Sequence, residues 1–245
     1  MSSSRSSLAI KVRPSLVPVS FLLALAAGDR AWAQQTEAAK LFPPSKFDTS
    51  ITGSDVAISG AWALVGDHTA GVGGQVYFFR RGPGGWTLQQ VERGFQSSTF
   101  GSVAIDGETA VVGAHLWDFG NTWRGKAYVY EWQGGSWMPV ENFLPPKLDD
   151  WSVFGWDVAI SGDVIVVGAP GADAVIKDGG EVFIYERVKG VWALVKRLQL
   201  PSVPKTLSWD YRFLGASVAV DGDLMVAGAP GKTGAAFVYE RGPTG

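Results

Sequence analysis

The segment Phe100-Gly101-Ser102-Val103-Ala104-Ile105-Asp106-Gly107 contains a phrase that this chain of 245 residues repeats four times. The phrase runs from a polar residue through Val-Ala-Ile or Val-Ala-Val to Ser-Gly or Asp-Gly, and its copies occupy residues 55–60, 102–107, 157–162 and 217–222. In every copy a second glycine follows the closing glycine by six residues, at Gly66, Gly113, Gly168 and Gly228. Self-similarity at a period of about 50 residues, built from short apolar strands, is typical of propellers and other repeat arrays.

Each repeat is predicted to contain four short strands. The phrase is the first strand, and a tight Asp-Gly or Ser-Gly turn leads into the second, which runs to the second glycine. A third glycine precedes an aromatic-rich strand such as Val76-Tyr77-Phe78-Phe79, and a tryptophan seven residues further on (Trp86, Trp137 or Trp192) opens the fourth strand. These strands are apolar at nearly every position, so both of their faces should be covered. We therefore expect an all-β fold, a β-propeller of four-stranded antiparallel blades; an open sandwich of the same meanders is the alternative.

The N-terminus has the form of a cleaved signal peptide. Arg5, Lys11 and Arg13 precede an apolar run over residues 16–27, and Ala31-Trp32-Ala33 fits a small-x-small cleavage site. The run is shorter than the roughly 20 residues that span a bilayer, although a retained anchor is the alternative. We expect a mature chain of residues 34–245 that is secreted, periplasmic or at the cell surface.

The composition excludes several classes of site. Without residues 1–33 the chain has 17 basic and 22 acidic residues, and a net charge of −5. A mildly acidic chain without a basic run offers nucleic acid nothing to bind. The chain has no cysteine, which excludes disulfides, a thiolate nucleophile and a thiolate metal site.

The repeated motifs resemble FG-GAP repeats, the units of the integrin-α type β-propeller that is also common in exported bacterial proteins. The resemblance rests on Phe100-Gly101 and Phe154-Gly155, together with Gly168-Ala169-Pro170 and Gly228-Ala229-Pro230, and it extends over about residues 40–245. It implies a binding or adhesion role outside the cytoplasm. Propellers of this family usually have seven blades, whereas this chain has four repeats. No loop carries the Asp-x-Asp-x-Asp-Gly calcium motif of several integrin blades, so we predict no cofactor, with calcium as the open alternative.

The repeats cover about residues 47–92, 100–144, 154–200 and 213–245, and the last of them lacks its fourth strand. Leu41-Phe42-Pro43-Pro44 parallels Phe143-Leu144-Pro145-Pro146 at the end of a fourth strand. One hypothesis is that residues 36–42 complete the last blade and close a ring of four, which would leave no open edge. The alternatives are self-association of two chains in one ring, or a partial propeller that completes a larger assembly.

The antiparallel order predicts two different ends of the fold. The tight turns lie at one end, and the long second-to-third-strand loops and the connections between repeats lie at the other, which we call the loop face. Loops of this kind carry function on a rigid scaffold, and exposed aromatics favour flat contact with sugars or proteins. Packing beneath their own loops is the alternative for each candidate. The candidate ligand-binding residues are Trp117, Trp123, Trp151, Trp209 and Tyr211.

Few residues are candidates for catalysis or metal binding. His68 and His115 occupy equivalent positions and should pair in adjacent blades, where they would begin a metal site or an acid/base set, or merely replace the usual proline at a turn. Asp173 and Asp178 are weak calcium candidates. No known catalytic motif is present. We therefore expect a non-enzymatic module that binds a protein or glycan, with a polysaccharide-acting enzyme as the alternative.

Overall fold

The computed structural model describes residues 39–41, 52–68, 73–94, 100–117, 122–144, 149–173, 177–200 and 212–242. These residues contain fifteen β-strands and no helix, so no membrane-spanning helix is found among them. The expected signal peptide, together with Trp209 and Tyr211, lies outside the described residues.

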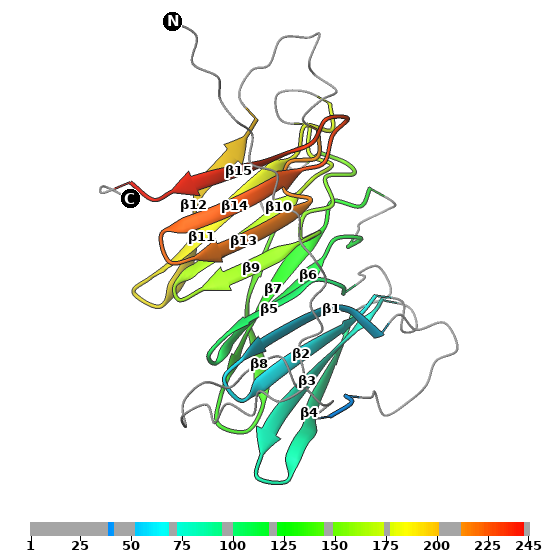
Figure 1. The fold of residues 1–245 in the computed structure, drawn as a ribbon, viewed down its shortest axis with the longest axis vertical. Helices are drawn as coiled ribbons and strands as arrows, with labels where there is room; N and C mark the ends of the chain where they lie inside the picture. Colours follow the sequence, from blue (N-terminus) through cyan, green and yellow to red (C-terminus); the bar gives the residue numbers. More distant parts are fainter. Residues whose placement is uncertain are drawn as a thin grey trace, which may run out of the picture. The chain divides into compact units, whose positions relative to one another are not determined.

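The strands form four antiparallel sheets that follow one another along the chain, as Figure 1 shows. The first three sheets have four strands and the fourth has three. The prediction of an all-β propeller built from antiparallel blades is thereby confirmed. The blades comprise β1 (Thr52–Ser59), β2 (Trp62–Asp67), β3 (Gln75–Gly82) and β4 (Gly85–Arg93); β5 (Val103–Asp106), β6 (Thr109–Ala114), β7 (Lys126–Trp132) and β8 (Trp137–Phe143); β9 (Val158–Ser161), β10 (Val164–Ala169), β11 (Glu181–Val188) and β12 (Val191–Gln199); and β13 (Ser217–Asp221), β14 (Leu224–Ala229) and β15 (Ala235–Glu240).

The closing glycine of the phrase makes the first hairpin of each blade. In the second blade Asp106 pairs with Thr109, which leaves Gly107 and one further residue as the turn. Gly107 has a φ of 57°, in the left-handed region that tight hairpin turns require and that glycine adopts without strain. The same geometry recurs at the other three copies, so the Ser-Gly and Asp-Gly pairs are explained by the turn.

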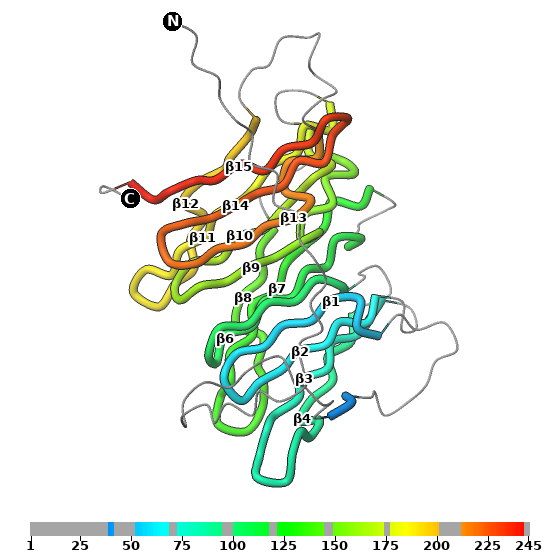
Figure 2. The backbone as a smooth tube through the Cα atoms, in the orientation of Figure 1, coloured from blue at the N-terminus to red at the C-terminus, as the bar shows by residue number. Residues whose placement is uncertain are grey.

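Consecutive blades pack face to face through apolar side chains. The first strands touch in sequence, β1 with β5, β5 with β9 and β9 with β13, and the tube in Figure 2 follows the same order from cyan to red. Leu64 and Phe78 of the first blade are buried in one cluster with Val112 and Trp137 of the second. Comparable clusters lie at the two other interfaces, which explains why the strands are apolar on both faces.

The first residue of the phrase links each blade to the next. Asp55 Oδ2 accepts a hydrogen bond of 2.7 Å from the amide of Val103. Ser102 Oγ accepts one of 3.0 Å from the amide of Val158, and donates to Asp157 Oδ1 over 3.0 Å. The polar first position of the phrase is thus an acceptor for the first-strand amide of the following blade.

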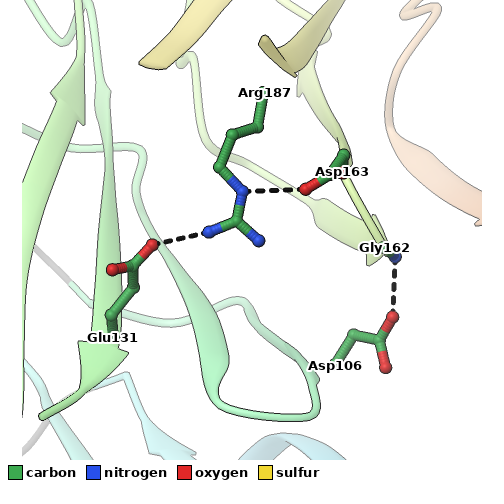
Figure 3. A network of polar contacts seen from close by, with 5 residues as sticks. All are labelled: Asp106, Glu131, Gly162, Asp163 and Arg187. Carbon is green, nitrogen blue, oxygen red and sulfur yellow. Dashed lines mark hydrogen bonds and ion pairs between the residues drawn. The ribbon is translucent and has the colours of Figure 1, made fainter. Parts of the chain in front are cut away.

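The fifth residue of the phrase makes a second set of interblade bonds at the tight turns. Asp106 Oδ2 accepts from the amide of Gly162 over 2.7 Å, as Figure 3 shows. Ser59 and Ser161 accept from the closing glycines of the second and fourth blades in the same way. Beside Asp106, Arg187 donates to Glu131 of the second blade and to Asp163 of its own blade.

The glycines of the FG and GAP motifs pack directly on one another across each interface. A Cβ on Gly113 would lie 2.1 Å from the carbonyl oxygen of Gly155, and one on Gly168 would lie 2.0 Å from that of Gly215. Only glycine permits backbones to approach this closely. The two motifs are therefore two sides of a single contact between neighbouring blades.

Leu41 lies on the first blade. It packs against the cluster that contains Phe79, with Trp86 beside it. Phe143, its counterpart in the sequence, stacks on Tyr185 at a ring-centroid distance of 3.7 Å. Leu41 therefore sits where the fourth strand of a preceding blade would end. In the described residues the fourth blade makes at most marginal contact with the first, so closure of a four-bladed ring is not seen at Leu41; residues 36–38 and 42 lie outside the described part.

Candidate functional site

The loop face is built where the end of one blade's loop runs beside the entry to the next blade. Residues 122–125 precede β7, and residues 151–154 precede β9. The amide of Trp151 donates to the carbonyl of Thr122, and that of Val153 to the carbonyl of Trp123 over 3.0 Å. Gly125 and Phe154 form a parallel bridge. These bonds hold two loops from neighbouring blades in one rigid ladder.

Trp123 and Trp151 project from this ladder as a pair. Their rings meet edge to face with centroids 4.6 Å apart. Both residues remain exposed, at 39% and 53% of their maximum accessibility. Both also hold left-handed backbone conformations, with φ values of 41° and 69°, which are strained for bulky side chains and are enriched at functional positions.

A hollow of about 470 Å³ opens beside Trp151. Asp150, which lines it, pairs with Arg124 at an N–O distance of 2.9 Å. Gly171 also lines it, and a Cβ there would lie 2.0 Å from the carbonyl oxygen of Trp151. The lining is rich in carboxylates, with a single lysine. The residues that line the hollow are Asp149, Asp150, Trp151, Gly171, Asp173, Lys177 and Asp178.

The two calcium candidates lie in this hollow, but their carboxylates already have partners. Asp173 Oδ1 accepts from the amide of Asp178 over 2.7 Å, and Asp178 pairs with Arg212 over 3.2 Å. Among the described residues no three His, Cys, Asp or Glu side chains converge in a metal-binding group. The contacts of this pair therefore order the loop.

Of the remaining aromatic candidates, Trp117 is partly buried, and Trp209 and Tyr211 lie outside the described residues. Trp117 packs against the cluster between the first two blades, and Lys126 Nζ lies 4.9 Å from its ring centroid. Its place is thus in the packing, away from the hollow. The structure brings together Trp123 and Trp151 from the predicted set.

The expected histidine pair is present. The rings of His68 and His115 lie 4.8 Å apart, and Trp156 meets His115 edge to face at 4.9 Å. His115 is 4% exposed, and its Nδ1 has no hydrogen-bond partner among the described residues. The pair borders a depression of about 250 Å³ that Asp55 and Asp157 also line.

Burial controls ionisation in this depression. Burial, and then the charge of His68, lower the pKa of His115 to about 4, so its imidazole is neutral at physiological pH. Burial raises the pKa of the Asp157 carboxyl, while hydrogen bonds from Val218, Ser102 and Val158 act in the opposite direction. The neutral imidazole of His115 thus packs against Trp156, near two carboxylates that accept hydrogen bonds from backbone amides of following blades.

Three residues of the loop face were not among the candidates predicted from the sequence. Trp156 is 46% exposed on the loop face, and its position directly after Phe154-Gly155 was the available signal. Asp149 and Asp150 line the hollow, whereas in the sequence they had only the ordinary features of a turn. Their role becomes visible only when the β10–β11 loop is placed opposite them.

Comparison with known proteins identifies the repeats. A family model described as FG-GAP repeat matches residues 96–130 and 147–185. No curated protein matches the chain. A solved structure of a europium-containing methanol dehydrogenase aligns over 76% of this chain and 38% of its own length, at 10% identity and a TM-score of 0.47, and nothing about activity follows from so distant a likeness. The chain therefore contains FG-GAP repeats, which the match places in its second and third blades.

Proposed function

We propose that the chain is an exported, non-enzymatic binding module that holds a glycan on the pair Trp123 and Trp151 and in the hollow that Trp151 lines. The observation that carries the proposal is the pair itself. Two exposed indoles lie 4.6 Å apart on strained backbone, and one of them, Trp151, lines a hollow whose polar groups are mainly carboxylates. FG-GAP propellers are typically extracellular, which agrees with export.

This combination suits a sugar for two physical reasons. The apolar C–H face of a pyranose ring covers an indole and removes both from water without ordering a flexible side chain. Its hydroxyls can then donate hydrogen bonds to Asp149, Asp150 or Asp173, since ionised carboxylates accept and do not donate.

The charge of the hollow predicts which glycans are favoured. Of the four aspartates among its described lining residues, Asp150 is paired with Arg124 and Asp178 with Arg212. Asp149 and Asp173 then face Lys177 alone, which leaves a small excess of negative charge. A sialylated, sulfated or uronic-acid glycan would meet this negative field and be disfavoured. We therefore assign neutral glycans as the ligand class.

The loop ladder adds preorganisation. Residues 122–125 and 151–154 are fixed to each other by backbone hydrogen bonds and do not depend on the ligand for their arrangement. A preorganised surface loses less conformational entropy on binding than a flexible loop. The affinity should therefore depend directly on the two indoles.

The experiment is a glycan array followed by titration in solution, with the purified protein and two variants. Trp151→Ala removes the indole at the hollow, whereas Trp156→Ala removes an exposed indole that does not line it. We expect neutral glycans to bind the parent and Trp156→Ala, and Trp151→Ala to weaken binding at least about tenfold, in line with loss of an aromatic anchor. Absence of any neutral glycan ligand, or equal binding by Trp151→Ala, would contradict the proposal.

A further inference from the structure

The two histidines of the chain lie side by side on the loop face. The sequence contains no others. His68 directly follows β2 and His115 directly follows β6, and their rings lie 4.8 Å apart between centroids, with 35° between the ring planes. The third and fourth blades have Pro170 and Pro230 at the same position. The pair is therefore a departure from the repeat that occurs in two neighbouring blades, and the scaffold itself does not require it.

Gly101 of the FG motif makes room for both rings. A Cβ on Gly101 would lie 2.7 Å from Nδ1 of His68 and 3.7 Å from Cε1 of His115. A larger residue would displace the ring of His68, because a Cβ does not come within 3.0 Å of another heavy atom. Both imidazoles thus rest against the same short stretch of backbone, which holds one ring beside the other.

A ring nitrogen of the pair is buried without a partner. His115 is 4% exposed, and among the described residues its Nδ1 has no hydrogen-bond partner. Buried polar atoms nearly always have a partner, and one that lacks it calls for an explanation, of which a bound ion is one. His68 is half-buried, and both rings border the depression of about 250 Å³. A small ion can therefore reach the pair from solvent.

The same depression has an excess of negative charge. Its two carboxylates, Asp55 and Asp157, accept hydrogen bonds from uncharged donors, the backbone amides of Val103 and Val218. No lysine or arginine is among the described residues that line the depression. Two carboxylates that no cationic side chain faces attract a cation from solvent.

We propose that His68 and His115 bind a divalent transition-metal ion, with Zn²⁺ as the expected ion, through one nitrogen of each ring. Two imidazoles that share a tetrahedral Zn²⁺ at about 2.0–2.1 Å have ring centroids roughly 5 Å apart. The observed separation of 4.8 Å fits this arrangement. The depression shares no lining residue with the hollow beside Trp151, so this site is independent of the proposed glycan site.

The donor set determines which ions the site prefers. In the described part of the chain no third His, Cys, Asp or Glu side chain completes a metal-binding group with the pair. Asp55 and Asp157 therefore act through their charge, and water takes the remaining coordination positions. Imidazole nitrogen suits Zn²⁺, Ni²⁺ and Cu²⁺, whereas Ca²⁺ and Mg²⁺ prefer carboxylate and carbonyl oxygens. The site should therefore take Zn²⁺ and not Ca²⁺.

The first test is calorimetric titration with ZnCl₂ and with CaCl₂. The protein is purified without a polyhistidine tag and freed of metal with EDTA. His68→Ala removes one proposed ligand at a half-buried position, so the variant should fold, and circular dichroism checks this. Trp156→Phe is the matched control, because it changes a residue that contacts His115 and keeps both histidines and an aromatic ring there.

We expect the parent and Trp156→Phe to bind one Zn²⁺ per chain, and neither to bind Ca²⁺ at the same concentration. Loss of an outer partner of a metal ligand weakens binding about 10–100-fold, so loss of the ligand itself in His68→Ala should weaken it at least about tenfold. A parent that binds no Zn²⁺, or a His68→Ala protein with the affinity of the parent, would overturn the proposal. So would a Trp156→Phe protein as weak as His68→Ala, or equal binding of Ca²⁺, which would assign the cation to the carboxylates.

A second measurement needs no variant. Because the chain has two histidines, the imidazole region of its NMR spectrum contains two sets of signals. Zn²⁺ should change both sets together and reach completion at one equivalent. A change at one histidine alone, or at neither, would contradict a shared ion.

Discussion

Asp157 Oδ2 accepts a hydrogen bond from the backbone amide of Val218 over 2.7 Å, across the interface between the third and fourth blades and 61 residues along the chain. The same carboxylate also receives the hydroxyl of Ser102 from the second blade. Asp157 therefore joins three successive blades. The first letter of the repeated phrase is an interblade link, and this explains why it is Asp or Ser in every copy.

Replacing this link should destabilise the fold. Asp157→Ala leaves the buried amide of Val218 without its acceptor, which should lower the free energy of unfolding by about 1–3 kcal/mol. Urea unfolding followed by tryptophan fluorescence measures the change. Asp163→Ala is the control, because Asp163 is an exposed partner of Arg187 and should contribute at most about 1 kcal/mol. If both variants lost the same free energy of unfolding, the interblade bond would contribute no more to stability than a surface ion pair.

The close approach of the motif glycines gives a second prediction. Gly113→Ala would place a Cβ 2.1 Å from a backbone carbonyl oxygen, so the second and third blades would have to separate. We expect a loss of at least about 1–3 kcal/mol, typical of overpacking, or failure to fold. Gly135→Ala meets nothing within 4 Å and should leave the thermal midpoint nearly unchanged. A Gly113→Ala protein as stable as the parent would refute the packing account of the GAP motif.

The free energy of unfolding should depend on pH through the protonation of His115. Above pH 6.5, the ordinary pKa, the imidazole is neutral in both states and its contribution is fully present. As the pH falls toward about 4, the unfolded chain takes up a proton that the folded chain does not, so stability is lost through this window. The total loss is on the order of 3 kcal/mol.

The measurement compares urea unfolding of the parent and of His115→Phe between neutral pH and pH 4. Other groups titrate in both proteins, so the difference between their pH profiles isolates His115. The variant should lose less stability on acidification than the parent does. Parallel profiles would mean that the burial of His115 has no effect on its protonation.

The sequence was sufficient for the fold because its signals are local and repeated. The spacing of Gly107 and Gly113 determines a hairpin, and four copies in register determine four blades. It also predicted that His68 and His115 meet, since equivalent positions in adjacent blades must be neighbours.

The site was less predictable because it depends on contacts between blades. Trp117 and Trp123 belong to one loop, yet the first packs inward against Lys126 and the second meets Trp151 on the surface. Nothing in the local sequence distinguishes Trp117 from Trp123. Their surroundings differ because the entry loop of the next blade supplies the partner of Trp123 alone. The placement of Leu41 on the first blade likewise depends on the angle between blades, which repeat spacing does not encode.

The most direct test of the proposed function follows the indole N–H signals of the tryptophans by NMR while a neutral glycan is added, with assignments from Trp123→Phe and Trp151→Phe. The account predicts that the signals of Trp123 and Trp151 shift together, and that the signal of Trp137, which is 1% exposed in the core, does not move. Shifts confined to other tryptophans, or no shift at Trp123 and Trp151 with a glycan that binds, would contradict it.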